Sequence, residues 1–204
     1  MRILADQAQV ARLIERLAAD IATDVRAFQA AGPWALVGLR SRGDDLARRL
    51  AGMLHPDHLG TLDFTLYRDD LAGASGQPVV RATEIDFPVD GLNVVLVDDV
   101  LMTGRSVRAA LQSLMDLGRP HRVWLSVLVD RGGRELPIAA DHVALDLTGH
   151  GAPAFRGLNT GLGEAPVAPD EVVEVRLQPT DSHDAIIVRP AGKRIPADQR
   201  RTAP

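Results

Sequence analysis

The sequence predicts an α/β protein whose central sheet is mostly parallel and is covered by helices on both faces. Short apolar runs, such as 34–39, 94–97 and 122–129, have the uninterrupted character of strands that are buried on both sides. Between them lie segments in which apolar residues recur at helical spacing, and strands that alternate with helices form parallel sheets. We therefore expect one α/β domain, over residues 1–189.

Length and composition fit such a domain. The 204 residues are 46% hydrophobic, which is enough to form a core. The net charge of −4 gives no general reason to expect nucleic acid as a partner. The chain has no cysteine, which excludes disulfides and thiolate metal sites and fits a cytoplasmic location. No apolar run approaches the ~20 residues that cross a bilayer, so we expect no membrane partner.

The individual elements follow from periodicity and from turn residues. Helices are expected at 6–30, 44–54 and 107–117. Strands are expected at 34–39, 61–71, 79–85, 94–97, 122–129, 142–147, 172–177 and 185–188. The strands at 61–71 and 79–85 would form a hairpin with a glycine-bearing tip, residues 149–170 a long loop, and the proline-rich residues 190–204 a disordered tail.

The strand at 94–97 leads into the most informative stretch of the chain. Asp98 and Asp99 follow the apolar run, and a loop of small residues at 103–106 precedes the next helix. Backbone N–H groups of such a loop, with the positive end of a helix, bind phosphate. Carboxylates repel phosphate but accept hydrogen bonds from hydroxyls. The stretch therefore predicts a ribose 5-phosphate site, and the alternative is a solvated strand end followed by an ordinary turn.

A second strand–loop–helix unit repeats this arrangement. The strand at 34–39 ends in a small basic loop made of Arg40, Ser41, Arg42 and Gly43. Ligands of open α/β sheets bind at the carboxyl ends of the strands. Arg42 is suited to hold a diphosphate by charge-assisted hydrogen bonds, although an ordinary turn with exposed arginines has the same composition. Together with the first cradle, the loop favours pyrophosphate binding.

Four motifs, in this order along the chain, resemble the PyrR proteins. The motifs are Val37–Gly43, Leu62–Leu71, Val97–Ser106 and Val127–Ile138. PyrR proteins are bifunctional pyrimidine operon attenuators and uracil phosphoribosyltransferases, and the similarity covers about residues 5–145. The resemblance implies a type I phosphoribosyltransferase fold with a flexible β-hairpin lid and a small hood.

The resemblance also implies a reaction, in which uracil and phosphoribosyl pyrophosphate (PRPP) give UMP and pyrophosphate through an oxocarbenium-like transition state. Asp98, Asp99 and Arg42 should carry catalysis. The 5-phosphate loop would be Val100, Leu101, Met102, Thr103, Gly104, Arg105 and Ser106; the pyrophosphate loop Arg40, Ser41, Arg42 and Gly43; the lid Tyr67, Arg68 and Asp69; and the base side Asp130, Val143 and Ala144.

The same resemblance implies Mg²⁺ as a cofactor, held mainly by substrate oxygens and water, with Asp98 and Asp99 as its candidate protein ligands. No nucleophilic residue is needed, no Ser/His/Asp arrangement is evident, and the scattered histidines are interpreted as structural or solvated. The family typically forms homodimers or larger homo-oligomers.

The chain departs from RNA-binding members of the family at positions where those members carry basic or polar residues. The residues found here are Glu15, Ala19, Gly133, Ala139 and Leu145, and only Arg134 keeps the charge. The loss of phosphate-facing cations predicts weak or absent RNA binding. The segment 144–170 also differs from the short Gly-Lys-Asn-Ile-Pro-like stretch of the family, and it lies near the base pocket.

Three hypotheses stay open. The chain is a uracil phosphoribosyltransferase, or a nucleotide-responsive RNA-binding attenuator of pyrimidine biosynthesis genes in which catalysis is secondary. Alternatively, it binds nucleotides and regulates a partner protein, or transfers ribose phosphate to another base.

Overall fold

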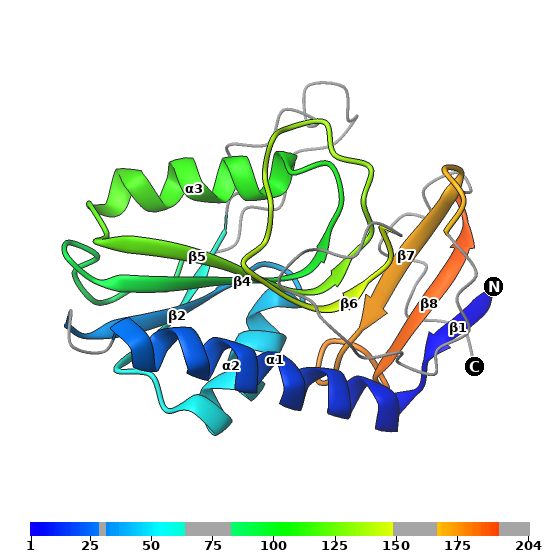
Figure 1. The fold of residues 1–204 in the computed structure, drawn as a ribbon, viewed down its shortest axis with the longest axis horizontal. Helices are drawn as coiled ribbons and strands as arrows, with labels where there is room; N and C mark the ends of the chain where they lie inside the picture. Colours follow the sequence, from blue (N-terminus) through cyan, green and yellow to red (C-terminus); the bar gives the residue numbers. More distant parts are fainter. Residues whose placement is uncertain (29–31, 64–82, 149–166, 192–204) are drawn as a thin grey trace.

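A five-stranded parallel sheet forms the centre of the molecule (Figure 1). The computed structural model describes residues 1–28, 32–63, 83–148 and 167–191. The strands of this sheet are β2 (Trp34–Leu39), β3 (His58–Leu62), β4 (Asn93–Leu101), β5 (Arg122–Asp130) and β6 (His142–Asp146). Their order is β3-β2-β4-β5-β6, and every neighbouring pair is parallel. The expected mostly parallel sheet is confirmed.

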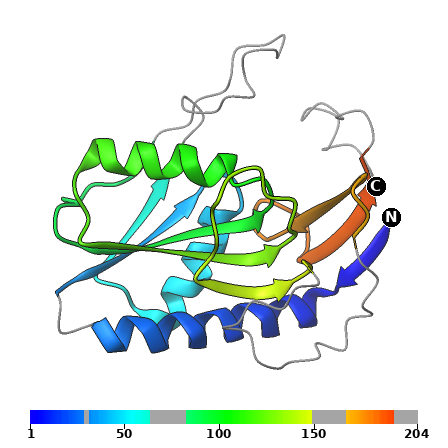
Figure 2. The same cartoon turned by 45° about the horizontal axis from the view of Figure 1, so that its top comes forward.

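Helices cover both faces of the sheet. Helices α1 (Gln7–Phe28) and α2 (Gly43–Leu54) pack on one face, and α3 (Arg105–Leu117) packs on the other (Figures 1 and 2). The apolar stripe that predicts α1 is buried along its whole length, in the same core as Val95 and Val97 of β4. A second core on the α3 side contains Val94 and Leu96. Because β4 is apolar on both faces, it reads as an unbroken hydrophobic run.

A second, antiparallel sheet lies beside the carboxyl ends of the central strands, and we call it the hood (Figure 1). It consists of β1 (Arg2–Ala5), β8 (Ala185–Pro190) and β7 (Glu171–Arg176), in the order β1-β8-β7. Strand β7 contacts β4 directly. The resemblance implies a small hood, and strands were expected at 172–177 and 185–188. Strand β1 was not expected, because the residues before α1 have no alternating pattern.

Several boundaries differ from those expected. Strand β4 continues beyond the two acids to Leu101, because its backbone keeps pairing with β5 as far as Asp130. Helix α3 begins at Arg105, so Ser106 is helical and does not lie in the loop. Strand β8 includes Pro190, which pairs with Glu171, so the strand extends into the expected tail.

The lid segment is described only at its two ends. Strand β3 begins at His58, earlier than expected, because it pairs in parallel with β2. Thr61 and Glu84 form an antiparallel bridge, as the predicted hairpin requires at its base. Tyr67, Arg68 and Asp69 lie outside the described residues, as do 149–166 and 192–204. No described helix is long and apolar enough to cross a membrane.

Candidate active site

The loop after β2 leads into α2, whose first residue, Gly43, lies directly against β4 at Val97 and Asp98. A Cβ added to Gly43 would lie 2.6 Å from the carbonyl oxygen of Val97 and 3.2 Å from the Cα of Asp98. A Cβ atom essentially never lies 2.6 Å from a backbone oxygen, so only glycine permits this approach. The pyrophosphate loop therefore lies directly against the acidic end of β4.

The two acids on β4 differ in exposure. Asp98 is buried and accepts a hydrogen bond of 2.9 Å from the backbone N–H of Asp99. Asp99 is half-buried, and its burial raises the pKa of its carboxyl group, while Arg42 and Asp98 act in the opposite direction. The carboxylate of Asp99 is thus partly desolvated and lies in the field of Arg42.

The pyrophosphate loop has an unusual backbone. The Arg40–Ser41 peptide bond is cis, and Arg42 has a φ of 70°, a backbone conformation that residues other than glycine rarely adopt. Arg42 is bound by Asp181 of the hood, through Nε at 2.8 Å and Nη2 at 3.1 Å. The side chain of Arg40 points elsewhere, because its Nη2 donates to Glu84 at the end of the lid segment.

The phosphate cradle lies at the N-terminus of α3. Gly104 precedes the helix with a φ of 87°, which turns the chain into it. Within the described part of the chain, no acceptor takes the N–H groups of Ser106 and Val107, so these donors are available to an anion. The N–H of Arg105 donates to the hydroxyl of its neighbour Thr103, and its side chain pairs with Glu135.

The residues after β5 form hydrogen bonds with the backbone of this cradle. The N–H groups of Glu135 and Leu136 both donate to the carbonyl oxygen of Thr103. Arg134 donates to the carbonyl of Met102 and, at 2.5 Å, to the carboxylate of Asp130. Of these residues only Asp130 was expected at the base side of the site, and that role stays a prediction; its partner Arg134 binds the backbone of the phosphate loop.

The remaining predicted residues lie in the sheet itself. Leu101 is buried in the α3-side core and Val100 packs partly into the other core, so their side chains face away from a ligand. Val143 and Ala144 are buried in β6, and Val143 pairs with Val127, the partner of Asp98. A base-side role for β6 stays a prediction.

The oxygen donors of the site fit Mg²⁺ that is bound mainly through substrate. The described residues hold no group of three or more His, Cys, Asp or Glu side chains that would bind a metal unaided. Magnesium commonly takes one or two carboxylates and completes its shell with phosphate oxygens and water. Asp98 and Asp99 offer such carboxylates.

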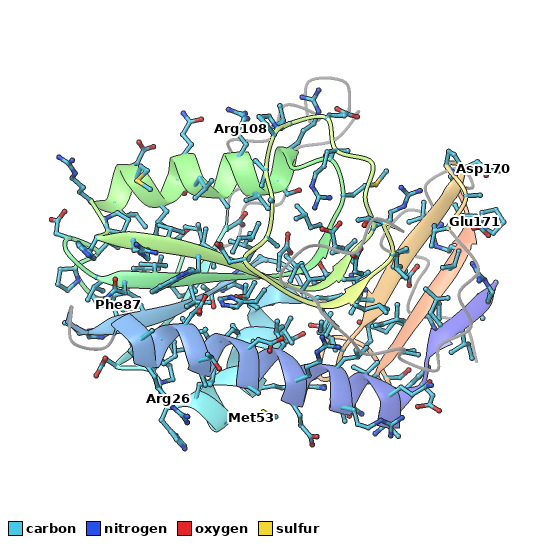
Figure 3. All side chains as sticks on the ribbon, viewed as in Figure 1. Arg26, Met53, Phe87, Arg108, Asp170 and Glu171 are labelled. Carbon is cyan, nitrogen blue, oxygen red and sulfur yellow. The ribbon has the colours of Figure 1, made fainter. Side chains whose placement is uncertain are left out.

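Three arginines, in the loops after β2 and β5 and in α2, attach the hood to the rest of the molecule, and sequence reasoning missed this arrangement. Besides Arg42, Arg49 of α2 pairs with Asp184 and donates to the carbonyl of Gln178. Arg131 donates to backbone carbonyls of 168–171 at the start of β7, where Figure 3 labels Asp170 and Glu171. The paired residues are far apart in sequence, so no local pattern reveals them.

Ser126, His142 and Asp24 form a hydrogen-bonded series, although no Ser/His/Asp arrangement was evident from the sequence. His142 lies 2.9 Å from the Ser126 hydroxyl through Nδ1 and 3.1 Å from Asp24 through Nε2. Ser126 is fully buried within β5, so its hydroxyl cannot reach a substrate. These hydrogen bonds instead connect α1 to β5 and β6, which agrees with the structural role expected for His142.

Comparisons with known sequences agree with this geometry. Residues 2–150 match the model of the phosphoribosyl transferase domain. The chain is 43% identical to the Bifunctional protein PyrR of Pelotomaculum thermopropionicum, over 90% of this chain and 92% of the relative. It is also 43% identical to the proteins of the same name from Deinococcus radiodurans and Thermus aquaticus, over 87% of this chain and 88% and 90% of those relatives.

Solved structures support the fold. A mutant hypoxanthine phosphoribosyltransferase from Trypanosoma cruzi, in a ternary substrates complex, is similar with a TM-score of 0.63 at 19% identity, over 93% of this chain and 96% of the other. A purine phosphoribosyltransferase from Pyrococcus horikoshii gives 0.52 at 22% identity, over 70% and 85%. With its anion cradle, its paired acids and these relatives, the chain belongs to the PyrR family of phosphoribosyltransferase-fold proteins.

Proposed function

We propose that the protein transfers the phosphoribosyl group of PRPP to uracil, forming UMP and pyrophosphate. One observation carries the proposal: the contact of Gly43 with Val97 and Asp98. This contact brings the cationic pyrophosphate loop against the acids of β4. The N-terminus of α3 comes directly after β4 in the chain and so lies near the same edge of the sheet. A diphosphate, a vicinal diol and a terminal phosphate are the three groups that such an edge matches.

In this mechanism the protein binds, orients and shields the substrate rather than attacking it. Asp98 and Asp99 accept hydrogen bonds from the ribose hydroxyls, and their charge favours the positive ring that develops as the C1–pyrophosphate bond breaks. The N–H groups of Ser106 and Val107 hold the 5-phosphate. Arg42 stabilises charge on the departing diphosphate, and the uracil nitrogen bonds to C1 from the other side and releases its proton to the solvent.

Magnesium would be held by Asp98 and Asp99 together with the substrate, where it supplies positive charge next to the diphosphate. Arg42 and the α3 N-terminus act on different parts of the same substrate, so their contributions are separable by mutation. The base, the cofactor, a cytoplasmic location and a homo-oligomeric state are parts of the proposal and not of the family assignment.

The relatives are named bifunctional, and the resemblance to PyrR proteins implies RNA binding as the second function. For this chain we propose that RNA binding is weak. The observation that favours this is the set of hydrogen bonds made by Arg134. Arg134 is the one cation retained at the positions where RNA-binding members of the family carry basic or polar residues. Its guanidinium donates to Ile138, Met102 and Asp130 and is therefore committed to the protein's own loop. A cation held in this way contributes little to phosphate binding.

The test of catalysis is uracil-dependent release of pyrophosphate from PRPP with magnesium. Asp99→Asn should lower kcat/KM by about 10²–10³-fold, because one preorganised charge at the reacting sugar is lost. Burial disfavours the charged form of Asp99, so the amide should leave the fold intact. Asp20→Asn, on the outer side of α1, is the matched control and should keep full activity. Absence of activity with any pyrimidine would refute the assignment.

A further inference from the structure

Asp181, in the connection between β7 and β8, binds the side chain that is expected to hold the diphosphate. Its two carboxylate oxygens accept from Nε and Nη2 of Arg42, at 2.8 and 3.1 Å. A contact of this kind fixes the plane of the guanidinium as well as its position. No described residue, Asp181 included, accepts a hydrogen bond from Nη1 of Arg42, so this amino group is left for a ligand.

Asp181 is itself rigidly held. Its backbone N–H donates to the carbonyl of Leu177 at 2.8 Å, and the N–H of Leu177 donates back to its carboxylate at 3.0 Å. Leu177 is fully buried in the core beneath the hood. The carboxylate of Asp181 is therefore held in place by the turn, independently of Arg42.

Arg42 also lies within electrostatic reach of Asp99 on β4. The charges of Asp181, Asp99 and Glu174 all favour the charged form of Arg42. Glu174 is already paired with Arg176 and Arg189, so its charge is largely compensated. Arg42 is thus hydrogen-bonded to the hood connection, and the next residue, Gly43, lies against the end of β4 that is expected to bind the sugar.

We propose that Asp181 is a positioning residue that presents the Nη1 edge of Arg42 to the diphosphate of PRPP. The inference rests on the proposed function, because it takes Arg42 to be the diphosphate ligand. An unheld arginine loses side-chain freedom when it binds, and a preoriented one avoids that loss. Charge alone would have the opposite effect, since Asp181 weakens the attraction of Arg42 for anions. The carboxylate lies at the Nε edge, however, and leaves the Nη1 edge in direct reach of the ligand.

The test measures binding of magnesium PRPP by calorimetry, and KM for each substrate, on the full chain. Asp181→Ala should weaken PRPP binding about tenfold and leave the KM for uracil unchanged. Asp184→Ala is the matched control, because this neighbouring carboxylate holds Arg49 and not Arg42; its Kd for PRPP should stay within about twofold of wild type. In an Arg42→Ala background, Asp181→Ala should have no further effect. Asp181→Asn, which keeps an acceptor oxygen, replaces the alanine variant if that variant does not fold.

The outcomes separate this proposal from the proposed function. Wild type that takes up no PRPP refutes both. Wild type that binds PRPP, with an Asp181 variant that binds equally well or more tightly, refutes only the positioning role. The same holds if the effect of Asp181→Ala persists in full without Arg42, since the loss would then come from the hood as a whole.

Discussion

Gly43 and Arg42 are neighbours that shape the same loop in different ways. Gly43 lets the loop approach the backbone of Val97, while Arg42, at a φ of 70°, sends its side chain toward the hood. The residue types of this loop were enough to predict an anion site. The partner of Arg42 could not be predicted, because Asp181 lies in a distant turn and belongs to no recognisable motif.

Replacement of Gly43 tests the close approach. Gly43→Ala would place a methyl group 2.6 Å from the Val97 oxygen, so either α2 or the acidic end of β4 must shift. We expect a loss of about 1–3 kcal/mol in the free energy of unfolding, measured by urea denaturation, together with a higher KM for PRPP. Gly52→Ala, on the same helix with open space around it, should instead stabilise by about 0.5–1 kcal/mol. Equal behaviour of the two variants would rule out the packing argument.

At the scale of elements, strands and helices with a repeating pattern were predictable and the pairing of the hood was not. The apolar stripe of α1 and the unbroken apolar runs of β2 and β5 are enough to predict these elements from the sequence. Strand β1 has only four residues and gains its conformation by pairing with β8, at the other end of the described chain. Such a strand is specified by its partner, and the sequence around it carries too little signal.

The attachment of the hood to α2 should depend on pH. Hydrogen bonds from Arg49 hold the pKa of Asp184 below the ordinary value of about 4 for aspartate. A carboxylate with a lowered folded-state pKa stabilises the protein above its unfolded pKa, and the stabilisation is lost as the pH falls through the folded pKa. Asp184→Asn should therefore cost about 1–3 kcal/mol at pH 7, and the difference from wild type should shrink as the pH falls below about 4.

Denaturant unfolding of wild type and Asp184→Asn between pH 7 and pH 3 measures this dependence. Asp86→Asn is the control, because Asp86 is exposed and should change the unfolding free energy by less than about 0.5 kcal/mol throughout. A gap between wild type and Asp184→Asn that stays constant over the whole range would show that the ion pair is not its source.

For the whole molecule, the distribution of charge bears on the second activity of the family. The exposed and half-exposed charges of α1 are balanced between Arg12, Arg16, Arg26, Glu15, Asp20 and Asp24. Arg26 lies on the outer side of the helix, away from the sheet (Figure 3). The whole chain carries a net charge of −4. The surface of α1 therefore lacks the cationic excess that attracts an RNA backbone.

We expect gel-shift titration with a pyrimidine leader RNA to give a Kd in the non-specific range of roughly 10⁻⁶–10⁻⁴ M at physiological salt. The double variant Glu15→Arg/Ala19→Arg adds cations to the exposed side of α1 and should bind more tightly, with a steeper dependence on salt. Tight, salt-sensitive binding by the wild-type protein would overturn the expectation.

The position of β8 between β1 and β7 has a practical consequence for protein engineering. The hood is assembled from both sides of the catalytic core along the polypeptide, so no single cut releases it as a transplantable module. A graft that exchanges this sheet for that of another transferase must replace Arg2–Ala5 and residues 171–190 together. Exchanging only one of these stretches would pair β1 and β8 from different proteins, whose registers need not agree.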